Sequence, residues 1–135
     1  MASELRVNTL KDASGNNSVA MSTVSNTIPK GYAYFNQETP GITDSFNASS
    51  LTDSATGVGG INWSSAMSSA SYMCTTGAPT VSSTNVYNVT ILDDGIYAYV
   101  TKTTTFWPFN AQYTGTGDAF SDLRGAICAA MGDLA

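Results

Sequence analysis

The stretch "NVYNVTILDDGIYAYVTKT" at residues 85–103 decides the fold class of this chain, because it has the pattern of a β-hairpin. Side chains alternate in character along 86–91, with Tyr87 and Val89 on one face, and they alternate again along 96–100. Between the two runs stands Asp94-Gly95, a dipeptide that accepts the positive φ angles of tight turns whose twist matches the flanking strands. The stretch therefore predicts two antiparallel strands joined by a short turn.

Four runs upstream have the same strand character and are separated by Gly, Pro, Asn and Asp residues. Ile61 falls on one face with Trp63, and Tyr72 falls with Cys74 opposite Met73. The runs are "GYAYFN" (31–36), "DSFNASSL" (44–51), "INWSS" (61–65) and "SYMCTT" (71–76). Short strands at regular spacing predict an all-β fold, which we expect to be a jelly-roll-like antiparallel β-sandwich.

The C-terminal stretch "DAFSDLRGAICAAMGDLA" (118–135) is open to two interpretations. Leu123, Ile127 and Met131 recur at i, i+4 and i+8, which is the spacing of one helix face. Gly125 interrupts that pattern, and the segment would be the only helix in a chain that otherwise predicts strands. Residues 119–131 are therefore left as helix or strand.

Polarity in this chain comes from hydroxyl groups more than from charges. It holds 17 Ser and 18 Thr, whereas charged residues make up 11% and the net charge is −5. Thr is well accepted on the solvent faces of strands, so this composition also favours β-structure. The five Lys and Arg residues are scattered and form no basic stripe, which argues against binding to nucleic acid. We expect no signal peptide and no membrane insertion, since no long apolar run is present.

The first 30 residues differ from the rest in having few large apolar side chains. Leu5, Val7 and Leu10 lie in a short strand-like run, which a turn at 12–17 follows. Such a segment buries little against itself, so it is either a disordered tail or a segment whose apolar residues pack on another chain. With Pro29 as the boundary, we expect an N-terminal arm at 1–30 and a β-sandwich domain at 31–135.

Residue types that carry catalysis or hold metals are sparse. The chain has no His, and its two cysteines, Cys74 and Cys128, lack the spacing of a zinc site, so we expect two buried thiols outside any disulfide. The Asp residues stand next to Gly, Ser or Thr, where local hydrogen bonds to backbone are their usual role. No segment matches the twelve-residue calcium loop. We therefore predict no catalytic residue, no metal and no cofactor.

The stretch "TFWPF" (105–109) is the candidate contact patch, with Phe106, Trp107 and Phe109 around a proline. Pro108 argues against a central strand, so residues 105–118 are expected to form a long connection or an interrupted strand. If "TFWPF" lies in a loop, its aromatic rings are harder to bury. Packing in the core or between subunits is one interpretation. Contact with a glycan or a protein is the other.

Two segments resemble small β-rich structural modules of tailed-bacteriophage virions, found in tail fibres, spikes and appendages of cyanobacterial and marine phages. The first is "ELRVNTLKDASG" (4–15), which is similar to "(L/I)-x-V-(N/D)-x-(L/I)-x-(D/N)-A-x-G". The second is "ITDSFNASSLTDSATG" (42–57), similar to "I-x-D-S-F-N-x-S-S-(I/L/V)-T-D-x-x-x-G", with "AMSSASY" (66–72) after it. The two segments lie in the first half of the chain. The second half resembles these modules only in its general composition and contains no matching motif.

The resemblance implies a structural virion protein, in a fibre, a spike or a head or tail decoration, and no enzyme. It implies a homotrimer that contacts other virion proteins, with Leu5, Val7 and Leu10 of the arm buried between subunits. The alternative function is a receptor- or carbohydrate-binding module of a tail fibre, with the contact patch touching a host surface glycan.

Overall fold

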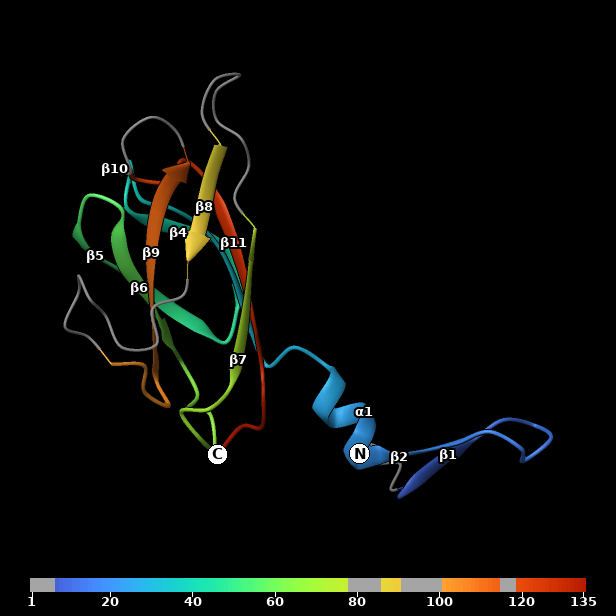
Figure 1. Cartoon of the computed structure of the whole chain (residues 1–135). Helices are drawn as coiled ribbons and strands as arrows, with labels where there is room; N and C mark the ends of the chain where they lie inside the picture. The colour runs from blue at the N-terminus through green and yellow to red at the C-terminus, as the bar shows by residue number, and fades with distance from the viewer. Residues whose placement is uncertain (1–6, 78–85, 91–100, 115–118) are drawn as a thin grey trace.

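The computed structural model describes residues 7–77, 86–90, 101–114 and 119–135, and in these the chain is mostly antiparallel β-structure (Figure 1). The all-β prediction is therefore confirmed, with one short helix that the sequence did not predict. In the stretch that decided the fold class, the first run forms β8 (Val86–Thr90). The turn at Asp94-Gly95 and the strand after it lie outside the described residues.

One sheet has four strands in the order β4-β3-β11-β7. Its central strands are β3 (Gly31–Asn36) and β11 (Ala126–Met131), flanked by β4 (Gly41–Phe46) and β7 (Met73–Gly77). All its neighbours are antiparallel. β3 and β11, which lie far apart in the sequence, thus pair at the centre of this sheet.

The other sheet has five strands built around β9 (Phe106–Thr114). β6 (Val58–Trp63) pairs with the first half of β9, whereas β8 and the short β10 (Ala119–Phe120) pair with its second half. β5 (Ala48–Ala55) pairs with β6 through a two-residue turn at Thr56-Gly57. Gly57 has a φ of 66°, the left-handed conformation that a tight hairpin turn requires and that glycine adopts without cost.

The two sheets share one hydrophobic core. The ring of Phe35 in β3 packs on Phe109 in β9 at 4.9 Å between centroids, and Trp107 packs on Phe109 at 5.4 Å. Small inward residues of β3 and β11, such as Ala33 and Cys128, leave room for these rings. The faces predicted for "INWSS" and "SYMCTT" are confirmed, since their same-face pairs are buried and Met73 is exposed.

Residues 119–131 form strands and a connection, which resolves the choice that the sequence left open. In β11 the buried residues Ala126, Cys128 and Ala130 alternate with more exposed ones. Leu123 is buried in the connection before β11, while Ile127 is exposed, so the i, i+4 spacing does not mark a helix face. Small apolar residues fit either periodicity, and pairing with β3 and β7 decides for the strand.

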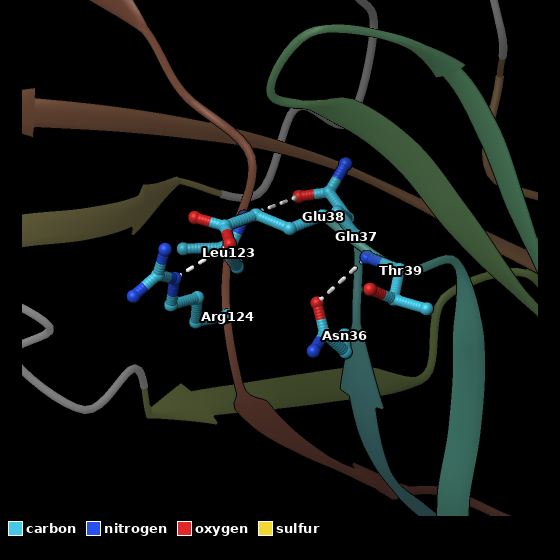
Figure 2. A network of polar contacts seen from close by, with 6 residues as sticks. All are labelled: Asn36, Gln37, Glu38, Thr39, Leu123 and Arg124. Carbon is cyan, nitrogen blue, oxygen red and sulfur yellow. Dashed lines mark hydrogen bonds and ion pairs between the residues drawn. The ribbon is translucent and has the colours of Figure 1, made fainter.

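Polar contacts hold the connection before β11 against the end of β3 (Figure 2). Gln37 donates its backbone N–H to the Leu123 carbonyl at 2.7 Å and accepts the Leu123 N–H on Oε1 at 3.3 Å. Arg124 Nε lies 2.5 Å from Glu38 Oε2 on the surface. The buried pair fixes the path of the chain, whereas an exposed ion pair of this kind contributes less than about 1 kcal/mol.

Candidate functional site

The N-terminal arm folds into a hairpin and a helix that carry no buried residue. β1 (Thr9–Lys11) pairs with β2 (Ser18–Ala20), and α1 (Met21–Thr27) follows directly. Figure 1 shows these three elements leading away from the two sheets. The predicted turn at 12–17 is present, but the strand predicted over 5–10 coincides with β1 only at its end, since Val7 and Asn8 are not in a strand. Neither β2 nor the helix was predicted.

Local hydrogen bonds form the turn of the hairpin. Asp12 donates its backbone N–H to the Asn17 carbonyl at 3.1 Å, and Gly15, at a φ of 70°, donates to the Asp12 carbonyl at 3.0 Å. The Asn17 amide also donates to the Asp12 carboxylate at 2.7 Å, and this bond lowers the pKa of Asp12 below its usual value. The turn is therefore specified by its own side chains and needs no support from the sheets.

Apolar side chains of the arm face solvent. Leu10 and Val19 are opposite each other in the hairpin register and are 45% and 36% exposed. A shallow hollow of about 290 Å³ is bounded by these two residues and their neighbours. Met21 and Val24 are three residues apart on one side of α1 and are half-buried, and Ile28, the residue that follows the helix, is 52% exposed.

Two of the three residues predicted to pack between subunits, Val7 and Leu10, are described by the structure. Val7 and Leu10 are both exposed, as expected of residues that lack partners within the chain, whereas Leu5 lies outside the described residues. Sequence reasoning missed Met21, Val24 and Ile28. Their helical spacing and Pro29 just after them were the available signals, since proline commonly follows a helix end. The missing side-chain cap at Ala20 made the start of the helix hard to recognise.

The root of the arm is attached to the sheets at Lys30. Its backbone N–H donates to the Ala130 carbonyl in β11 at 2.8 Å, and its carbonyl accepts from Asn47 Nδ2 at 3.0 Å. Asn47 also accepts the Ser65 N–H on Oδ1 at 2.6 Å. It has a φ of 57° at the corner between β4 and β5, a conformation that Asn tolerates better than most residues. Asn47 therefore holds the arm root, the corner and the end of β6 together.

The predicted contact patch does not form an exposed loop. Trp107 and Phe109 are fully buried in β9, and Phe106 is half-buried with its ring over Gly60 in β6. The expectation of an exposed loop is wrong, and core packing is the correct interpretation for Trp107 and Phe109. Pro108 is accommodated because β8 joins β9 only from Asn110 onward, so the described strands contact Pro108 on the β6 side alone.

The cysteines are buried and are not joined by a disulfide, as predicted. Cys128 lies in β11 and Cys74 in β7, both on the side of the core. Burial raises the pKa of the Cys128 thiol to about 12, against a smaller opposing effect of a backbone hydrogen bond with Ala33. At neutral pH this thiol is protonated and therefore a poor nucleophile or ligand.

Acidic residues are dispersed over the described residues. Asp44 and Asp53 lie exposed in β4 and β5, and Asp122 accepts the Gly57 N–H at 2.7 Å, a structural contact. Across the ranges that the structure describes, no group of three His, Cys, Asp or Glu side chains is placed to hold a metal ion.

Comparison with known proteins gives no match to a protein family, to a characterised protein or to a solved structure. Within the described ranges, no helix combines the length and the apolar character needed to cross a membrane.

Proposed function

We propose that this chain is a structural protein of a tailed-bacteriophage virion, used in a fibre, a spike or a head or tail decoration. It acts as a homotrimer that contacts other virion proteins, with residues 1–30 as the assembly arm and 31–135 as the β-domain. The observation that carries the proposal is the arm itself, an ordered hairpin and helix in which no described residue is buried and Leu10, Val19 and Ile28 are exposed. Sequence resemblance supplies the virion context.

Exposure of this kind has a free-energy cost that association removes. Each aliphatic side chain that becomes buried contributes about 1.5–3 kcal/mol. Leu10, Val19 and Ile28 are 45%, 36% and 52% exposed, so burying them against a partner stabilises the assembly. The trimer and the jelly-roll-like connectivity stay predictions, since the described strands establish two antiparallel sheets and leave both questions open.

The alternative function, a receptor- or carbohydrate-binding module, rested on an exposed aromatic patch. Trp107 and Phe109 are buried, so these rings offer no platform for a sugar. The stretch at 105–109 therefore gives that alternative no support.

The arm is tested by replacing Leu5, Val7 and Leu10 with Asp in the full chain. Val7 and Leu10 are exposed, so the β-domain should keep its thermal unfolding midpoint while the variant loses self-association and is no longer incorporated into virions. The matched control places Asp at Ser54, Thr56 and Ser68, which are exposed and lie outside the four-stranded sheet. Normal incorporation of the arm variant would contradict the attachment role, and unfolding of its β-domain would place the arm in the core.

A further inference from the structure

The outer face of the four-stranded sheet is apolar, although it points away from the core. We call the outward side chains of β3, β4, β7 and β11 the outer face; its largest members are Tyr32, Tyr34, Phe46, Met73 and Ile127. Phe46, Met73 and Ile127 are 53%, 54% and 50% exposed. A sheet face in contact with water is usually polar, so this one is unusual for a surface without a partner.

The strand register makes the outer face continuous. Phe46 is opposite Tyr32, which is opposite Ala129, which is opposite Thr75, so one row crosses all four strands. The next row sets Tyr34 beside Ile127. A hollow of about 270 Å³ lies at the seam of β7 and β11, bounded by Ile127, Ala129 and Gly77 among others. The face therefore has both projecting side chains and a recess.

The outer face carries little charge, so the repulsion between acidic chains opposes association there only weakly. The chain has a net charge of −5, so two copies repel each other where acidic residues are exposed. Among the outward positions of the four strands, Asp44 is the single charged residue, and it lies on the flanking strand β4. The apolar side of α1, with Met21, Val24 and Ile28, is likewise uncharged. The outer face and this side of the arm are therefore both apolar and nearly uncharged.

The outer face alone is too small for a stable interface between two copies. Four strands at about 4.8 Å spacing and six residues at about 3.3 Å give a footprint of about 400 Å². A stable interface buries about 800 Å² on each partner, so two outer faces packed together give about half of that. Contact between two arms would leave the outer face uncovered. An arm placed on an outer face buries no more of that face at one contact, but in a closed ring each chain buries both its arm and its outer face.

We propose that the arm of one copy packs on the outer face of the next copy, through Val24 and Ile28 of the arm and Phe46 and Ile127 of the outer face. This inference rests on the proposed assembly function and names the receiving surface. The contact is head-to-tail, so three copies close into a ring in which every arm and every outer face is used. The exit of the arm supports a neighbour as the acceptor, because Lys30 is bonded to β11 and no described arm residue is buried on its own sheets.

The test uses two full-length variants that damage opposite halves of the contact. The arm variant carries Val24→Lys and Ile28→Lys, and the face variant carries Phe46→Lys and Ile127→Lys. A control variant carries Ser54→Lys and Thr56→Lys, which add the same charge at exposed positions of β5 and its turn. Circular dichroism and thermal unfolding establish that each variant is folded. If the face variant is not folded, Phe46→Thr with Ile127→Thr replaces it, because Thr suits an exposed strand.

Light scattering with gel filtration then gives the mass of each variant and of their equimolar mixture. The control should form the wild-type trimer, and each variant alone should be monomeric. The mixture should form a species of about twice the chain mass, because the intact arm of the face variant fits the intact face of the arm variant and no third chain can add. A mixture that stays monomeric beside a trimeric wild type overturns the arm-on-face contact and leaves the assembly role standing. A monomeric wild type overturns both.

Discussion

At the scale of single residues, small side chains determine how closely the parts of the fold approach. A Cβ at Gly57 would lie 2.5 Å from the Ala111 carbonyl oxygen and 2.7 Å from the Ser121 nitrogen, so only glycine fits between β9 and the connection after β10. Gly60 leaves the space that the Phe106 ring occupies. Space for the large rings of the core is likewise left by small side chains, among them Ala33 and Cys128. The aromatic rings of the core therefore fit only because the strands that face them carry glycine or small side chains at the points of contact.

Cys128 gives this packing a measurable pH dependence. Burial raises its pKa from 9.0 to about 12, so above 9.0 the unfolded chain ionises while the folded thiol stays protonated. The contribution of Cys128 to the free energy of unfolding should be fully present below pH 9.0. It should fall by about 1.4 kcal/mol per pH unit as the pH rises from 9.0 toward the pKa of the folded state.

The measurement compares urea unfolding of the wild type and Cys128→Ala just below pH 9.0 and about two units above it. Other groups titrate in both proteins, so the difference isolates Cys128. The wild type should lose more stability than Cys128→Ala over this range. Parallel losses would show that the thiol is not buried as the structure has it.

At the scale of elements, the sequence predicts strands well where period-two alternation meets a single core. β3, β6 and β7 bury the residues that their alternation selects, because one face of each strand meets the other sheet. β11 could not be assigned, since Ala126, Ile127 and Cys128 suit a helix as well and only its pairing decides.

Two elements were missed for other physical reasons. β9 was taken for a loop because Pro108 lacks an N–H, and the sequence does not reveal that β8 joins further along. α1 lacks a side-chain cap and has only seven residues, so its local signal is weak. In the candidate site, Leu10 and Val7 could be recognised as unsatisfied, but the outer face could not, because it needs the order of four strands.

The corner at Asn47 allows a prediction about how the arm joins the sheets. Asn47→Gly keeps the backbone freedom at φ 57° but removes the side-chain bonds to Lys30 and Ser65, whereas Asn47→Ala also forces an alanine into the left-handed region. Partly exposed bonds contribute about 1 kcal/mol each, and the alanine strain adds about 1–2 kcal/mol. Urea unfolding should rank wild type above Asn47→Gly and that above Asn47→Ala. Equal values for Gly and Ala would contradict the strained corner.

At the scale of the whole molecule, the distribution of apolar surface separates fold from assembly. The two sheets complete their own core, so the domain needs no partner for its interior. The arm and the outer face, by contrast, expose large apolar side chains on a chain whose surface is otherwise rich in Ser and Thr. Association through these two surfaces accounts for both exposures at once.

The mass of the full-length chain in solution tests this account most directly. Light scattering coupled to gel filtration at micromolar concentration should give about three times the 14.1 kDa chain mass. The trimer should persist on dilution within the micromolar range and in high salt, because apolar contacts are not screened as charges are. A single species at the mass of one chain, even at high micromolar concentration, would contradict assembly through the arm.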